Sequence, residues 1–120
     1  MAVPTRTIPD NLGTGVPVQH PVVAYSADGA ITLVAGGKAH LTKTSAGAYT
    51  LAAPYADGVE LTLIADTAFA HVVTIPTAAA GGGAGQDVLT FGGAINDSIK
   101  LSGYNGKWYI EGAPRNVTAA

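Results

Sequence analysis

The chain has no cysteine among its 120 residues, and charged side chains make up only 12% of it. Without cysteine there is no disulfide framework and no thiolate chemistry, and the redox compartment cannot be inferred. The net charge of −2 offers no basic surface, which argues against nucleic acid as a partner. No apolar run approaches the roughly 20 residues of a membrane-spanning helix, so we expect no membrane association.

Large hydrophobic side chains are also few. Hydrophobic residues account for 48% of the sequence, but much of this share is alanine, and there are 16 glycines. A chain with few charges and few large core-forming residues is a poor candidate for a self-sufficient monomer, so we expect a homo-oligomer. Its length allows one domain, or one domain with an extended arm.

Catalytic and metal-binding patterns are missing too. The three histidines, His20, His40 and His71, have no HxH or HExxH spacing and no cysteine partner, so neither a metal site nor a cofactor is expected. Asp28 and Asp57 belong to Asp-Gly turns, in which the carboxylate bonds to nearby backbone. No serine lies in a G-x-S-x-G elbow, and we expect no catalytic residues.

What the sequence does contain is a series of short apolar-alternating segments, separated by glycine, aspartate and proline, from Val22 onward. This pattern predicts an all-β fold: a compact β-sandwich or barrel, or a β-helix-like domain, of short antiparallel strands. No window keeps a 3.6-residue apolar period, so helices should be minor. The glycine-rich tract at residues 78–87 has no phosphate-loop pattern, and we interpret it as a flexible surface loop.

The N-terminal residues differ from the rest of the chain. Four of the seven prolines lie within residues 1–21, and proline removes backbone donors and favours extended conformations. We therefore expect an extended N-terminal arm at residues 1–21, a β domain at residues 22–113 and a C-terminal tail at residues 114–120.

The chain also shows a weak internal repeat. Ala27-Asp28-Gly29 recurs as Ala56-Asp57-Gly58, 29 residues later, and Ala39-His40 recurs as Ala70-His71, 31 residues later. The two spacings nearly agree, which predicts two related β units with the two histidines in equivalent places. A repeated position fits a structural role at least as well as it fits a paired metal site.

Asn105-Gly106 gives the strongest local signal in the sequence. It lies between two alternating runs, and a type I′ turn needs two residues at positive φ, which Asn and Gly tolerate. The resulting register pairs Gly103 with Trp108 and Lys100 with Glu111. The second pair is a favourable cross-strand charge pair.

This register separates the aromatic residues of the hairpin onto two faces. The inward face carries the predicted structural core, and Trp108 can lie over Gly103, which has no side chain. We interpret the only tryptophan as packing rather than as a ligand platform. Tyr104 and Tyr109 fall on the more polar face, as possible exposed aromatic contacts. The predicted core residues are Leu101, Trp108 and Ile110.

Residues 27–112 resemble small β-rich structural proteins of tailed bacteriophages, found among head decoration (cement) proteins and in tail fibre or tailspike modules. The likeness rests on Asp-Gly-x-x-Leu-Thr at residues 57–62, a polar strand ending in proline at residues 71–76, and Gly-x-Trp-Tyr at residues 106–109. It implies a non-catalytic virion protein, usually a trimer, located on the capsid surface.

Among these proteins, we expect a capsid decoration protein whose partner is the major capsid protein. The chain begins with Met, as a small complete gene product would, and its extended arm suits attachment to a capsid lattice. Binding across capsid subunits would add contacts present only in the assembled shell and so stabilise it. The expected capsid contacts in the arm are Pro4, Arg6, Ile8, Pro9, Leu12 and Val16.

Two alternatives remain open. A tail fibre, tailspike or receptor-binding module would contact host surface carbohydrate, with Tyr104 and Tyr109 stacking on sugars. A carbohydrate-active enzyme would instead use Asp or Glu residues that are distant in the sequence and meet only in the fold. Copy number and loss of host adsorption distinguish a fibre from a decoration protein, and polysaccharide turnover identifies an enzyme.

Overall fold

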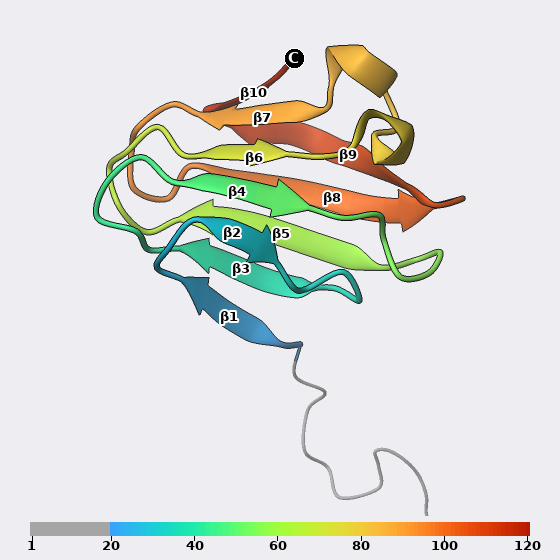
Figure 1. The fold of residues 1–120 in the computed structure, drawn as a ribbon, viewed down its shortest axis with the longest axis horizontal. Helices are drawn as coiled ribbons and strands as arrows, with labels where there is room; N and C mark the ends of the chain where they lie inside the picture. Colours follow the sequence, from blue (N-terminus) through green and yellow to red (C-terminus); the bar gives the residue numbers. More distant parts are fainter. Residues whose placement is uncertain (1–19) are drawn as a thin grey trace, which may run out of the picture.

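The computed structural model describes residues 20–120, which form two five-stranded β-sheets packed face to face around one core (Figure 1). We call them sheet A and sheet B. Sheet A has the order β1 (Val22–Tyr25), β3 (Gly37–Leu41), β5 (Glu60–Ala65), β8 (Ser98–Tyr104), β9 (Lys107–Arg115). Sheet B has the order β10 (Val117–Ala119), β7 (Val88–Phe91), β6 (Val72–Thr74), β4 (Ala48–Leu51), β2 (Gly29–Ile31). The predicted all-β fold is confirmed.

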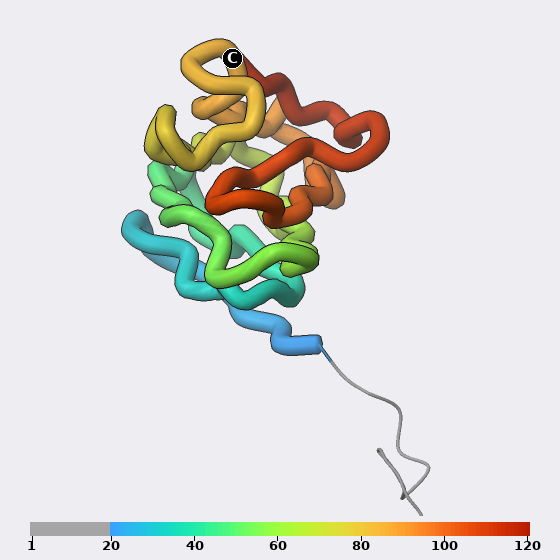
Figure 2. Tube along the Cα trace, turned by 90° about the vertical axis from the view of Figure 1, so that its right-hand side faces the viewer, coloured from blue at the N-terminus to red at the C-terminus, as the bar shows by residue number. Residues whose placement is uncertain are grey.

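The first six strands build a β-helix-like stack. The chain crosses from sheet A to sheet B after β1, β3 and β5 and returns after β2 and β4, so each sheet gains parallel neighbours. Figure 2 shows these layers following one another from the blue end of the trace. The strand pairing in each sheet is therefore mixed rather than solely antiparallel. When the chain crosses to the other sheet and comes back, the new strand runs in the same direction as the previous strand of that sheet, so the two pair in parallel.

The repeat of this stack differs from the one predicted. From the first turn to the second the offset is 16 positions in sheet A (Val22 to Lys38) and 20 in sheet B (Gly29 to Tyr49). From the second turn to the third it is 24 in both sheets, as from Lys38 to Thr62 and from Ala48 to Val72. His40 lies in β3 of sheet A, whereas His71 immediately precedes β6 of sheet B. The two histidines are thus not equivalent, and the predicted two-unit repeat is wrong. What the layers share is alternating burial rather than residue identity.

The C-terminal half closes the stack with antiparallel strands. Residues 114–120, predicted as a tail, instead contain the end of β9 and the whole of β10. Val117 pairs with Phe91 of β7, and Asn116 makes the turn between the sheets with φ 54°. The β domain therefore continues to β10, because this strand is needed to cover β7. The predicted arm lies mostly outside the described residues; the carbonyl of Pro21 already accepts a hydrogen bond from Lys38 at 2.8 Å.

The predicted hairpin is confirmed, with Asn105 at φ 54° and Gly106 at φ 73°. Leu101 is buried, Ile110 is half-buried, and Trp108 is only 2% exposed. The indole N–H of Trp108 donates to the carbonyl of Ala52 at 2.7 Å, which satisfies its one polar group.

One detail of the hairpin differs from the prediction. A side chain added at Gly103 would meet the Cβ of Pro54 at 2.7 Å, with no tryptophan atom among its three nearest neighbours. The 52–58 loop therefore fills the space over Gly103, while Trp108 points into the core from the neighbouring strand.

A buried carboxylate fixes the turn between β7 and β8. Asp97 accepts the backbone N–H of Ala94 at 2.9 Å, and both of its oxygens lie 3.2 Å from Nδ2 of Asn116. The carboxylate is thus joined to the corner between β9 and β10. This contact ties the C-terminal strand to the body of the fold.

Candidate functional site

The three histidines suspected of chemistry do not come together. His40 Nδ1 lies 2.6 Å from Asp66 Oδ1 on the outer face of sheet A, while His71 is fully buried. His20 lines an open hollow near the start of β1. Within residues 20–120, no group of three or more His, Cys, Asp or Glu side chains could hold a metal ion.

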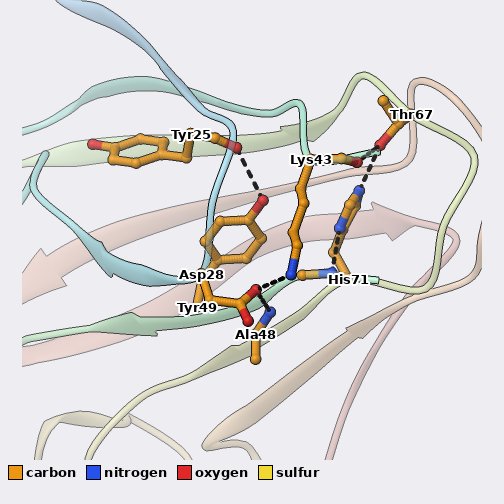
Figure 3. A network of polar contacts seen from close by, with 8 residues as sticks. Tyr25, Asp28, Lys43, Ala48, Tyr49, Thr67 and His71 are labelled. Carbon is orange, nitrogen blue, oxygen red and sulfur yellow. Dashed lines mark hydrogen bonds and ion pairs between the residues drawn. The ribbon is translucent and has the colours of Figure 1, made fainter. Parts of the chain in front are cut away.

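His71 is a structural residue of the core. The backbone N–H of Gly47 donates to Nδ1 at 3.0 Å, so Nε2 carries the proton and donates to the Thr67 hydroxyl at 2.9 Å. That hydroxyl donates in turn to the carbonyl of Lys43 at 2.6 Å (Figure 3). Burial, with a smaller contribution from the Lys43 charge, lowers the pKa of His71 below its ordinary value of 6.5. A neutral, fully hydrogen-bonded imidazole stabilises the fold and is not available to a ligand.

The same region joins three successive turns of the stack. Asp28, before β2, accepts bonds from the Lys43 ammonium at 2.8 Å and from the Ala48 N–H at 2.9 Å, both at the next turn (Figure 3). The Lys43 hydrogen bond and the Ala48 N–H hold the pKa of Asp28 below its ordinary value. Thr67 and His71 continue the connection to the third turn. These contacts hold the layers in register and form no catalytic pair.

The glycine-rich tract is an ordered cover rather than a free surface loop. It contains two short 3-10 helices, η1 (Thr77–Ala79) and η2 (Gly83–Gly85). Between them, Ala80 bridges to Trp108, and the N–H of Gly81 donates to the Trp108 carbonyl at 2.7 Å. The tract therefore covers part of the open edge of β9. Its local sequence carries no strand pattern, which is why this contact was missed.

The outer face of sheet A is a polar surface crossed by two rows of paired side chains. Lys38, Thr62, Lys100 and Glu111 are register partners across four strands, and Glu60, Ser102 and Tyr109 form the next row. An open hollow of about 190 Å³ lies over this face, beside a second one of about 310 Å³ near the start of β1. The first hollow is lined by His20, Gly37, Lys38, Glu60, Thr62 and Lys100.

Both tyrosines predicted to be exposed lie on this face. Tyr104 is 63% exposed and Tyr109 is 40% exposed, and their ring centroids are 6.4 Å apart with an interplanar angle of 54°. The hairpin register places them on one side of the sheet, diagonally across β8 and β9. This tyrosine pair and the polar rows beside it are the first candidate binding surface.

The N-terminal edge of the stack is the second candidate surface. Among the described residues, no strand pairs with the outer edge of β1 or of β2. Val22, in β1, is 62% exposed. The Tyr25 hydroxyl accepts the N–H of Thr32 at 2.9 Å, so this side chain spans from β1 to the segment after β2 and closes the end of the core.

A scan of family models and searches of curated proteins and of solved structures found no match to this chain. In the described part of the chain, no helix is long and apolar enough to cross a membrane.

Proposed function

We propose that this protein is a non-enzymatic structural protein of a tailed-bacteriophage virion. In this proposal it is a capsid decoration protein that binds as a homotrimer to the major capsid protein on the outside of the head. The resemblance of residues 27–112 to phage β-rich structural proteins suggests the class, and the open strand edge at β1 and β2 is the observation that carries the mode of attachment.

The backbone of β1 shows which groups are free to bind. The carbonyls of Pro21 and Tyr25 accept hydrogen bonds from Lys38 and Thr42 on the β3 side. Since alternate residues of a parallel strand bond to opposite neighbours, Val22 and Ala24 direct their N–H and C=O groups away from β3. Within the part of the chain that the structure describes, no strand pairs with these groups, and such an edge is a template for strand addition by another chain.

This edge adjoins the segment predicted to be an arm. A strand edge and a neighbouring arm provide two linked attachments, and the second attachment benefits from the high local concentration that the first creates. Contacts that exist only on the assembled shell stabilise that shell by mass action. Asp28 and His71 join successive turns of the stack. The stack therefore supplies a rigid body for these two attachments.

The experiment uses a proline in the free edge. In Ala24→Pro the lost N–H is one that faces away from β3, and proline is tolerated on edge strands, so the fold should persist. Ala24→Ser is the matched control, because it keeps the N–H. Purified wild-type and variant proteins are added to heads that lack the protein, and binding is measured by co-sedimentation and by the temperature at which the shells open.

We expect wild type and Ala24→Ser to bind in large number and to raise the opening temperature, and Ala24→Pro to bind weakly. Deleting residues 1–20 should also leave a folded trimer that no longer binds. Folded wild-type protein that neither binds heads nor changes their heat resistance would contradict the proposal. Full binding by both Ala24→Pro and the deletion would contradict the mode of attachment.

A further inference from the structure

The tyrosine pair on the outer face of sheet A is not used by the attachment proposed above. Tyr104 lies at the hairpin tip and Tyr109 follows on β9, at the opposite end of sheet A from β1. An exposed aromatic ring presents an apolar face and a hydroxyl, and aromatic side chains lose little conformational entropy when they bind. The two rings are tilted with respect to one another, so their faces line a corner rather than a flat stack.

Tyr109 is held in place by the glycine-rich tract. A Cβ added at Gly81 would lie 2.6 Å from Cδ1 and 2.7 Å from Cε1 of the Tyr109 ring, so only a glycine allows the backbone so close. The Gly81 N–H is fixed by its bond to the carbonyl of Trp108. The ring is thus supported by backbone along one edge and remains partly open to solvent, which makes it a preorganised contact.

Hydrogen-bonding side chains continue from the rings across the sheet. Ser102 lies directly opposite Tyr109, and Glu60 lies directly opposite Ser102. Since neighbouring strands are about 4.8 Å apart, these groups follow one another at short, regular steps. Thr62 and Lys100 border the same row and line the adjoining hollow of about 190 Å³. The surface combines aromatic faces with regularly spaced donors and acceptors.

The charges on this surface are largely matched among themselves. Lys100 lies 3.5 Å from Glu60 and 4.0 Å from Glu111, so its charge is offset on both sides. A surface of this kind has no strong field for a polyanion. The large exposed aliphatic residues, Val22 and Ile95, lie on β1 and in the β7–β8 turn, away from the rings. An uncharged, hydroxyl-rich ligand with apolar C–H faces matches this surface better than a protein or an anion does.

We propose that the outer face of sheet A binds a neutral oligosaccharide, with one or two sugar rings stacked on Tyr104 and Tyr109. Hydroxyl groups of the following sugars bond to Ser102, Glu60 and Thr62. The site is separate from the β1–β2 edge, so it stands whether or not the protein attaches to capsids. Both attachments can be occupied in the same molecule.

The test is isothermal titration calorimetry of the full chain with three neutral probes, maltohexaose, cellohexaose and N-acetylchitohexaose, and one anionic probe, polygalacturonate. We expect at least one neutral probe to bind with a Kd of about 1 mM or tighter. Tyr104→Ala and Tyr109→Ala should each weaken that binding by about tenfold, while Tyr109→Phe, which keeps the ring, should retain most of it. Tyr55→Ala is the control for loss of an exposed tyrosine, because Tyr55 is 79% exposed and belongs to the 52–58 loop rather than to a strand of sheet A.

Several outcomes would overturn the proposal. One is the absence of binding by every neutral probe at about 10 mM. A second is binding that survives both alanine variants or that falls equally in Tyr55→Ala. A third is a preference for polygalacturonate that salt abolishes. A fourth is dissociation of an oligomer by Tyr104→Ala, which would make this face a contact between copies. Tyr104 is mostly exposed, so its variant should fold even if that of Tyr109 does not.

Discussion

At the scale of single residues, buried polar groups in this protein are satisfied by specific partners. His71 is held between Gly47 and Thr67, and Trp108 bonds to the carbonyl of Ala52. An unmet polar group in such positions would cost about 1–3 kcal/mol, so these contacts fix how the turns and loops lie against the core.

The protonation state of His71 should make stability depend on pH. Its pKa is lowered in the fold, so below pH about 6.5 the unfolded chain binds more protons than the folded one. Its contribution is therefore complete above pH about 6.5 and is lost as the pH falls toward its lower folded pKa. Urea unfolding between pH 7.5 and pH 5, buffered in about half-unit steps, measures this loss.

Two variants separate His71 from other titrating groups. His71→Gln should be less stable at neutral pH, with a smaller decline on acidification. His40→Gln removes the histidine beside Asp66 and leaves the buried imidazole in place, so a decline on acidification should still be present. An equal slope in the wild type and in His71→Gln would contradict the role assigned to this imidazole.

Removal of the indole at position 108 should be severe. Trp108 is buried, and Trp108→Ala leaves a cavity and an unpaired Ala52 carbonyl, so we expect a loss of about 3–5 kcal/mol in the free energy of unfolding. Tyr104→Ala in the same hairpin should stay within about 0.5 kcal/mol of wild type. Chemical denaturation followed by circular dichroism compares the two, and a stable, well-folded Trp108→Ala protein would argue against a core role.

At the scale of elements, the glycine-rich tract acts as an edge cover for β9. Its two 3-10 helices flank Ala80 and Gly81, which bond to the strand at Trp108. An uncovered strand edge invites pairing with other chains, and a covered one does not. The tract therefore protects one end of sheet A, while at the other end no described strand pairs with the outer edge of β1.

Gly81→Ala should destabilise this cover. The added methyl group would lie 2.6 Å from the Tyr109 ring and 2.8 Å from the Trp108 carbonyl oxygen, and the backbone atom cannot easily yield. We expect a loss of about 1–3 kcal/mol. Gly85→Ala is the matched control in the same tract, since nothing lies within 4 Å of its added Cβ, and it should be neutral or slightly stabilising. Thermal unfolding of both variants tests this expectation. Equal midpoint temperatures for Gly81→Ala and Gly85→Ala would contradict the edge-cover role.

Elements that depend on neighbouring residues could be predicted from the sequence. The Asn105-Gly106 turn fixed the hairpin register from Lys100 to Glu111, and with it the burial of Trp108 and the exposure of both tyrosines. The spacing of the layers could not be found, because it changes from 16 to 24 positions along sheet A, and equivalent positions such as Lys38 and Thr62 share a burial pattern and no identity.

Contacts between distant segments account for the other features of the fold that the sequence did not predict. The strand nature of β10 depends on β7, which lies more than twenty positions earlier, and the bridge from Ala80 depends on Trp108. The filling of the space over Gly103 by Pro54 is of the same kind. A local pattern shows where a strand can end, but it does not show which segment will lie beside it.

At the scale of the whole molecule, the fold presents two different surfaces on a rigid body. Among residues 20–120, no strand pairs with the β1–β2 edge, and this edge carries the exposed Val22, as strand addition requires. The outer face of sheet A carries matched charges and the tyrosine pair. In the proposed function, the separation of these two surfaces would let the protein hold a shell through the β1–β2 edge and still contact its surroundings through the tyrosine pair.

The central claim is that the protein coats a phage head, and copy number tests it most directly. The proposal requires that a phage encode the chain; particles of that phage are purified, and the ratio of this protein to the major capsid protein is measured by quantitative gel densitometry. A decoration protein predicts copies in near-stoichiometric proportion to the capsid protein. A few copies per particle, as in a tail fibre, or none at all, would contradict the account.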